Sequence, residues 1–355
     1  MDADISHAPV EIQESTNGNI WSHDFMILSP ARMAKLTDII GHASQRQQLK
    51  KDLEQGNVSH AYLFSGPDHL GKMSLALTFA AELLSVGKSE GERLKTRTAV
   101  EKLTHSDLLV LDRLWIEEVC EDWDVIAGSS NVPQGHRAKK PAAKTDTIGI
   151  DDVRALQERL METGMGTYRC CIIRSVERMQ DAAANAFLKI LEEPPEGLIF
   201  ILTTESQGAL LPTIVSRTRV IPFQRIATKE IRKLLDGVSE DDSRFILHIA
   251  GGAPGLAAKL RDDPDLLRLH RTVHGSAQQF FRSQSLRERL SLLTPLKERG
   301  QESDDFLLHL GLALREQPSH TLVRYTEPYR ALVSDLETNA HRQLLAERFA
   351  LEVHS

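Results

Sequence analysis

The stretch from residue 168 to residue 219 constrains this chain most, because two short apolar runs enclose one amphipathic segment. The first run covers residues 170–173 and the second covers residues 198–202. Short apolar runs of this kind are typical of buried parallel strands. Between them, residues 182–193 place apolar side chains at helical spacing, and Pro194 and Pro195 end the helix. The pattern predicts strand, helix and strand, and therefore an α/β fold with a parallel sheet.

Composition excludes several classes of protein. A length of 355 residues gives room for two or three domains. The net charge of -7 and an aromatic content of 5% argue against a surface built mainly to bind nucleic acid. Cys170 and Cys171 are adjacent in a predicted strand and Cys120 is the only other cysteine, so we expect no disulfide framework. We also expect no membrane span and no secretion signal, and therefore the cytoplasm.

A glycine-bounded loop between a predicted strand and a predicted helix resembles a phosphate-binding loop. The strand covers residues 61–64, and the loop contains Gly66, Gly71 and Lys72. In such loops, backbone N–H groups and a lysine hold phosphates, and a Ser or Thr hydroxyl holds magnesium. Met73 stands where that hydroxyl belongs, and a thioether is a poor ligand for a hard cation. The loop is therefore either a structural relic, which the missing hydroxyl favours, or a working ATP site.

Three sequence words in this chain resemble a known family. They are AANAFLKILEEPPEG, FILTTE and LLPTIVSRTRVIPF, which begin at residues 183, 200 and 210. These words are similar to the core of bacterial clamp-loader proteins of the AAA+ superfamily, and most of all to the delta prime subunits of DNA polymerase III. The resemblance covers about residues 36–260 and is weaker beyond them.

The resemblance implies a fold that is α/β plus all-α. A poorly ordered tail would cover residues 1–35, followed by an AAA+ domain at 36–224 with helices on both faces of its sheet. A small helical lid would cover 225–264 and a helical oligomerisation collar 265–355. Within the AAA+ domain, residues 127–146 form an expected mobile insertion that contains the basic stretch 137–144.

The resemblance also implies that the groups for ATP hydrolysis are missing. Arg174 stands where the family has its magnesium-binding Asp, and Ser175 stands where it has its catalytic Glu. Leu256 occupies the place of the arginine that senses the γ-phosphate. Residues 85–104 lack the four cysteines of the family's zinc module. We therefore expect no zinc or other metal, no cofactor and no intrinsic catalysis.

One catalytic feature of the family is retained. Ser216 and Arg217, followed by Thr218, match the family's Ser-Arg-Cys motif. In the family, the arginine reaches the nucleotide of a neighbouring subunit and stabilises charge on the transferred phosphoryl group. From residue type alone, a surface salt bridge at a sheet edge is the favoured interpretation of Arg217, whereas within the word LLPTIVSR the finger is favoured.

These features together predict a scaffold subunit of the clamp loader in the bacterial DNA polymerase III holoenzyme. Its expected partners are the gamma/tau and delta subunits, and through the complex the sliding clamp and primed DNA. Two alternatives stay open. The chain is an active AAA+ loader ATPase, or it is a standalone DNA-binding protein that uses the basic stretch 137–144.

Overall fold

The core of the protein is a five-stranded parallel sheet, seen in a computed structural model that describes residues 39–111, 147–161, 164, 166–338 and 340–354. The strands lie in the order β2-β3-β4-β1-β5. Their bounds are β1 Ala61–Ser65, β2 Leu108–Leu111, β3 Arg169–Ile173, β4 Leu198–Thr204 and β5 Arg219–Pro222. The two apolar runs of the sequence become neighbours in this sheet, with Cys171 opposite Phe200. The predicted parallel α/β sheet is confirmed.

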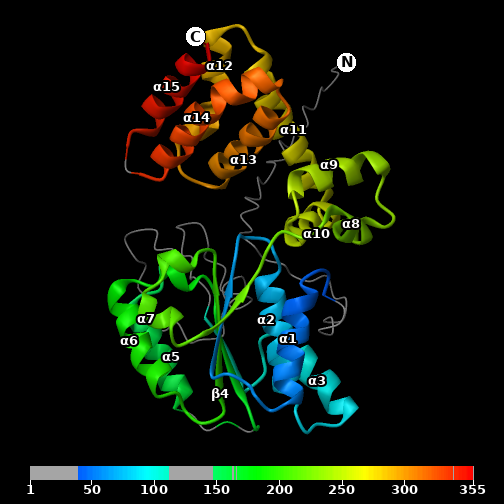
Figure 1. The fold of residues 1–355 in the computed structure, drawn as a ribbon, viewed down its shortest axis with the longest axis vertical. Coiled ribbons are helices and arrows are strands. Elements are labelled where there is room, and N and C mark those ends of the chain that lie inside the picture. The colour runs from blue at the N-terminus through cyan, green and yellow to red at the C-terminus, as the bar shows by residue number, and fades with distance from the viewer. Residues whose placement is uncertain (1–38, 112–146, 162–163, 165, 339, 355) are drawn as a thin grey trace, which may run out of the picture.

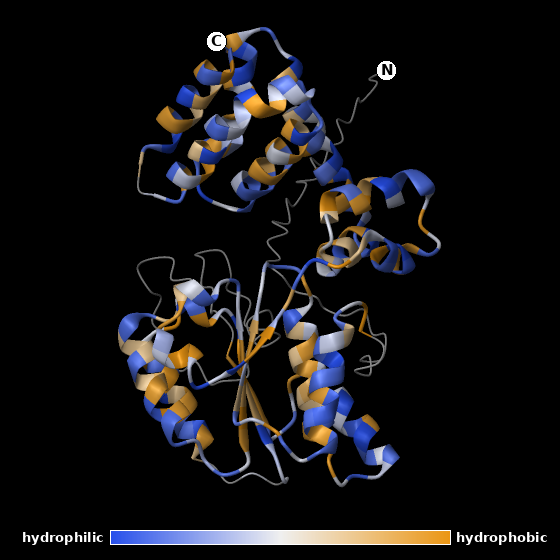
Figure 2. Ribbon diagram, viewed as in Figure 1, coloured by the Kyte–Doolittle hydropathy of each residue, from blue (hydrophilic) through white to orange (hydrophobic). Residues whose placement is uncertain are grey.

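Helices cover both faces of the sheet (Figure 1). One face carries α1 (Ala43–Glu54), α2 (Lys72–Leu83) and α3 (Glu90–Glu101). The other carries α5 (Ile150–Leu160), α6 (Asp181–Glu192) and α7 (Pro212–Val215). Figure 2 shows the hydrophobic strands between the two helical layers. Because both faces are covered, the strands need apolar side chains at every position, which explains their unbroken apolar runs.

Helix α6 begins and ends within one residue of its predicted bounds. Its apolar stripe contains Phe187, whose ring meets that of Phe200 edge to face at a centroid distance of 5.3 Å. The helix ends before Pro194, because proline has no N–H for another helical turn. This contact fixes α6 against the middle strand of the sheet.

The start of α5 differs from the prediction. An Asp directly before an amphipathic segment is a usual helix cap, so the sequence predicts a cap at Asp151, but Gly149 occupies the cap position. The carboxylate of Asp152 accepts a hydrogen bond of 2.8 Å from the backbone N of Gly149. A carboxylate three residues after the cap can reach back to it, whereas Asp151 points outward and pairs with Arg154 at 3.0 Å. The expected cap at Asp151 is therefore wrong: the cap residue lies two positions earlier, at Gly149, and the carboxylate that binds its backbone is that of Asp152.

The rest of the described chain is helical and has two further apolar cores. The first is formed mainly by α8, α9 and α10, whose bounds are Thr228–Arg232, Glu240–Ala250 and Pro254–Asp262. The second lies within the bundle of α11 Pro264–Arg282, α12 Leu286–Leu292, α13 Gln301–Arg315, α14 Ser319–Leu336 and α15 Arg342–His354. Figure 1 shows this bundle beyond the small helical group, at the end away from the sheet. We propose that the domain boundaries lie near residues 225 and 265, on either side of the small helical group.

Three expectations concern residues outside the described part of the chain. These are the tail at 1–35, the insertion at 127–146 with its basic stretch, and Cys120. Cys170 and Cys171 are buried free thiols, and burial raises the pKa of both. None of the described helices has both the length and the apolar character that crossing a bilayer requires.

A buried carboxylate joins α1 to the sheet. Asp52 accepts a hydrogen bond of 3.0 Å from the hydroxyl of Tyr62 on β1. It also pairs with the guanidinium of Arg219 on β5 at 2.8 Å. Burial and the adjacent carboxylate raise the pKa of Tyr62 to about 12, although the N–H of Ser59 opposes this shift. The single carboxylate therefore ties two strands and a helix together.

We predict that Asp52→Asn lowers the free energy of unfolding by about 2 kcal/mol, because a buried hydrogen-bonded charge pair loses one partner. Asp151→Asn is the matched control, since it breaks an exposed pair worth less than about 1 kcal/mol. Urea unfolding followed by circular dichroism measures both variants. Equal small losses would mean that the Asp52 network contributes little.

Candidate functional site

The loop between β1 and α2 has a backbone that requires glycine at its first position. Gly66 has a φ of +152°, and a Cβ on it would lie 2.3 Å from the carbonyl oxygen of Phe223. No side chain fits there, because the neighbouring backbone already fills the space. Gly71 stands at the cap of α2 with a φ of 84°. The loop therefore has the strand–loop–helix form that the sequence predicted for a phosphate-binding loop.

Lys72, the phosphate-binding lysine of that pattern, points back into its own loop. Its Nζ donates hydrogen bonds to the carbonyl oxygens of Gly66 and Pro67, the second at 2.7 Å. Asp68 lies 3.8 Å from the same nitrogen. Only 9% of the side chain is exposed, and burial lowers the pKa of Lys72. The ammonium group is thus satisfied by the protein at the point where a phosphate would have to bind.

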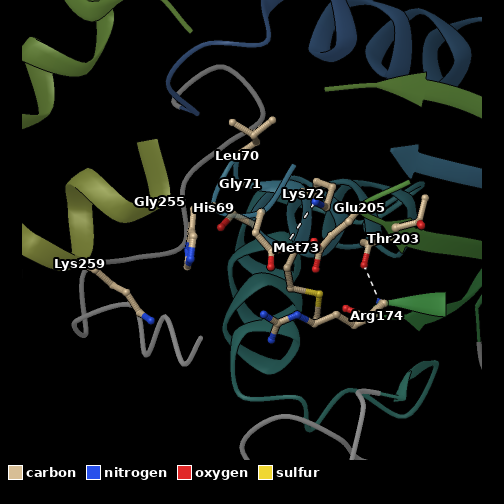
Figure 3. Close-up of a pocket in the computed structure, with 14 residues that line it drawn as sticks. His69, Leu70, Gly71, Lys72, Met73, Arg174, Thr203, Glu205, Gly255 and Lys259 are labelled. Carbon is tan, nitrogen blue, oxygen red and sulfur yellow. Dashed lines mark hydrogen bonds and ion pairs between the residues drawn. The ribbon is translucent and has the colours of Figure 1, made fainter. Parts of the chain in front are cut away.

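The pocket in front of Lys72 is small (Figure 3). It has a volume of about 80 Å³, below the roughly 300–1,000 Å³ of typical ligand sites. Met73 and Ser74 both line it. Ser74 is one residue later than the usual hydroxyl position, which is a rotation of about 100° around the helix, so the sequence predicts that it points away. Ser74 nevertheless borders the pocket, but not from position 73, where a phosphate-binding loop has its magnesium-binding hydroxyl.

The end of β3 contributes a cation and no acid. Arg174 and Ser175 both line the pocket, as their alignment with the family's acidic positions predicted. Ser175 has a φ of 52°, and its backbone N donates a hydrogen bond of 3.0 Å to the hydroxyl of Thr203. A guanidinium where magnesium would bind repels the metal. Together with the occupied lysine and the small volume, these residues do not fit a magnesium nucleotide.

Acidic side chains lie close to Lys72 instead. Asp68 and Glu205 both line the pocket, and Glu177 accepts a hydrogen bond of 3.2 Å from the backbone N of Glu205. Burial and the carboxylates of Asp68 and Glu177 raise the pKa of Glu205 to about 7. Negative charge near Lys72 is therefore supplied by the chain itself, which disfavours a polyanionic ligand.

The first turn of helix α10 packs against the loop at His69. The backbone N of Gly255 donates a hydrogen bond of 2.8 Å to the carbonyl oxygen of His69, and a Cβ on Gly255 would come within 2.7 Å of that oxygen. Leu256, at the expected place of the sensing arginine, packs against the apolar cores of the sheet and the small helical group. Lys259, one turn further on, lines the pocket and was not predicted from the sequence.

Arg217 lies away from this pocket. It follows α7, and its guanidinium pairs with Glu192 at the end of α6 at 2.7 Å. It also donates a hydrogen bond of 3.1 Å to the carbonyl oxygen of Thr213. Ser216 donates to the same carbonyl at 3.1 Å, and 36% of the Arg217 side chain is exposed. The structure therefore brings Gly71 and Lys72 together in one pocket and places Ser216 and Arg217 at a separate surface.

We predict that Glu205→Gln removes a pH dependence of stability. A carboxyl with a pKa of about 7 in the folded state holds its proton more tightly than it does when unfolded. Its contribution is therefore present at low pH and is lost as the pH rises from about 4.5 through 7.

Relative to the parent, Glu205→Gln should gain stability as the pH is raised from 5 to 8, by no more than about 1 kcal/mol because solvent screens an exposed carboxylate. Urea unfolding at several pH values measures this gain. Glu196→Gln, an exposed control at the other end of β4, should give a difference that does not vary with pH. A flat difference for Glu205→Gln as well would contradict the raised pKa.

Comparison with known proteins places residues 41–227 in a family described as DNA polymerase III, delta subunit. The chain is 31% identical over 232 residues to DNA polymerase III subunit gamma/tau of Mycobacterium tuberculosis, covering 63% of this chain and 36% of that protein. It is 28% identical over 237 residues to the delta' subunit of Bacillus subtilis, covering 64% and 63%. It is 35% identical over 126 residues to the delta' subunit of Escherichia coli, covering 34% and 37%. The chain thus spans little more than a third of the gamma/tau relative.

Two solved structures from Thermotoga maritima are also similar. The RuvB Holliday junction branch migration motor shares 17% identity at a TM-score of 0.42, covering 65% of this chain and 64% of that one. A DNA polymerase III gamma subunit-related protein shares 19% identity at a TM-score of 0.41, covering 86% and 98%.

Proposed function

Because this chain belongs to the family described as DNA polymerase III, delta subunit, we propose that it is a clamp-loader subunit of the delta prime type that does not hydrolyse ATP. It serves as a rigid scaffold within the ring of loader subunits. It also donates Arg217 to the nucleotide site of a neighbouring subunit.

The observation that carries the first half of this proposal is the state of Lys72. Its ammonium group already has two carbonyl partners within the loop and is nearly buried. Binding a nucleotide would require breaking these contacts and also placing phosphates next to Asp68 and Glu205. The guanidinium of Arg174 repels the magnesium ion that would otherwise offset the negative charge of the phosphates. Each change is unfavourable, and together they support a subunit without its own hydrolysis.

The position of Arg217 supports the second half. It does not line the pocket of its own chain, so it cannot act on a nucleotide bound there. Its ion pair with Glu192 is exposed on both sides and is worth at most about 1 kcal/mol, so a stronger partner can replace it. A planar guanidinium offers two parallel donors to phosphate oxygens, which is the geometry that transition-state charge requires.

The proposed partners follow from the relatives and from the resemblance. They are gamma/tau subunits, which supply the ATP-hydrolysing neighbour, and a delta subunit, with the sliding clamp and primed DNA as the substrates of the whole complex. We place this assembly in the cytoplasm with the replicating chromosome. The alternative of a standalone DNA-binding protein rests on residues 137–144, which lie outside the described chain.

The purified chain should neither bind nor turn over ATP. With magnesium present, we expect no saturable binding of a fluorescent ATP analogue and no phosphate release above a blank, because Lys72 and Arg174 leave no place for the γ-phosphate and its metal. An isolated ATPase among the gamma/tau relatives serves as the positive control. Steady turnover that is lost in Lys72→Ala would establish the active-ATPase alternative in place of our proposal.

In the reconstituted complex, Arg217→Ala should slow ATP turnover at the facing site by about 10³-fold or more, which is the effect of losing an arginine finger. The total ATP turnover of the complex should then fall by at least the fraction that the facing site contributes. Glu192→Gln is the matched control: it removes the ion pair within the chain and leaves the guanidinium in place.

These two variants separate the two interpretations of Arg217. A finger predicts a large loss for Arg217→Ala and little change for Glu192→Gln, with the complex still assembled in both. A surface salt bridge predicts equal, small effects. Gel filtration of each complex confirms that assembly is intact before the rates are compared.

A further inference from the structure

Four histidines and a glutamate form a continuous chain of side chains where α9 meets α11 and α13. His248 comes from α9, His270 and His274 come from α11, His309 comes from α13, and Glu316 follows the end of α13. Figure 1 shows α9 and α11 at the junction between the small helical group and the bundle. Nothing in the proposed function uses these residues.

The outer end of the chain has the geometry of a metal site. Glu316 Oε1 lies 2.8 Å from His248 Nε2 and 3.2 Å from His274 Nε2. The three ligand atoms all lie within 4.8 Å of one another. Zinc held at about 2.0–2.1 Å by tetrahedral ligands separates those ligands by about 3.3 Å, so small side-chain shifts suffice. We propose that His248, His274 and Glu316 bind one divalent transition-metal ion of the zinc class, with water as the fourth ligand.

The inner end of the chain orients the ligand at its centre. His274 Nδ1 faces His309 Nδ1 at 3.3 Å, and His309 Nε2 faces His270 Nδ1 at 2.8 Å. If each ring donates inward along this series, every contact has one donor and one acceptor, and His274 Nε2 keeps its lone pair for the ion. A ligating histidine whose other nitrogen is hydrogen-bonded in this way is typical of metal sites.

Hydrogen bonds also orient the carboxylate ligand. The amide of Gln278 donates to Glu316 Oε2 at 2.8 Å, and Glu316 Oε1 is the oxygen that faces His248 and His274. A neutral imidazole and a carboxylate are the forms that bind zinc.

The site is open on one side and connects two parts of the chain. The side chains of His248 and Glu316 are 39% and 31% exposed, so an ion and a water can enter. Arg271 on α11 already holds α9 nearby by pairing with Asp241 and Asp242 and by lying over the ring of Phe245 at 4.5 Å. An ion bound to His248 would therefore lock α9 of the small helical group to the bundle.

The test is a titration of the untagged full-length chain with Co²⁺ and then with Zn²⁺ in competition. We expect one saturable Co²⁺ site with the visible absorption of a tetrahedral complex, displaced by Zn²⁺. His248→Ala and Glu316→Gln should each weaken binding at least tenfold. Both change partly exposed side chains, so the variants should fold. His341→Ala, at an exposed histidine outside the cluster, should bind as the parent does.

Absence of saturable binding, or binding that is equal in the parent and both ligand variants, would refute the site and leave the cluster as a hydrogen-bond network. Hydrogen exchange tests the link between α9 and the bundle. Zinc should slow the exchange of α9 amides in the parent and not in His248→Ala. Zinc binding that leaves the exchange of α9 unchanged would refute the lock.

Discussion

The hydrogen bonds from the ammonium group of Lys72 to its own loop are the interactions on which the nucleotide region of this protein depends. A phosphate-binding loop works because its lysine and its backbone N–H groups point outward together. Here the Nζ of Lys72 donates to carbonyl groups of its own loop. The backbone N of Gly255 on α10 donates to the carbonyl oxygen of His69 in the same loop. These contacts within the chain therefore hold the loop and α10 in one arrangement. This is why a chain that lacks the magnesium ligands can still hold the shape of its family.

Arg217 is positioned by interactions other than those that shape the pocket. Its place after α7 depends on the pairing of β5 with β1 and on the packing of α6 against the sheet, and on nothing in the pocket. A guanidinium positioned by a buried parallel sheet keeps its direction whether or not the pocket of its own chain binds a nucleotide. The two halves of the proposed function, no hydrolysis and a donated arginine, are therefore compatible in one fold.

How much of this was predictable depends on the range of the interactions. Strands β1 and β3 and helix α6 were predicted to within one residue, because unbroken apolar runs and a helical stripe are local signals. Strand β4 continues two residues beyond its apolar run, through Thr203 and Thr204, and β5 was not predicted. The cap of α5 was predicted two residues too late, because whether Asp151 or Asp152 reaches the cap depends on where the backbone turns at Gly149. The residues of the loop were identified, but the inward direction of Lys72 was not, since it depends on the carbonyl groups of a folded loop. Lys259 was missed because only the packing of α10 brings it to the pocket.

The histidine cluster shows the same limit at a greater distance. The expectation of no metal came from missing cysteines in residues 85–104, whereas the candidate ligands come from three elements between residues 248 and 316. The local signal was the spacing of His270 and His274, which puts both rings on one face of a helix. Their partners on α9 and α13 could be found only from the fold.

The small helical group of α8–α10 is held on two sides, and this has a consequence for the proposed ring of subunits. In an AAA+ subunit that turns over nucleotide, the lid moves because its contacts change with the γ-phosphate. In this chain, the backbone of Gly255 on α10 binds that of His69 in the loop, and α9 is joined to the bundle by Arg271 and, as we propose, by a metal ion. If the chain binds no nucleotide, as we propose, no ligand would have a differential affinity with which to move the small helical group, and the sheet, this group and the bundle would act as one fixed support. In the proposed complex, the ATP-driven motion of other subunits would then have one such support to move against.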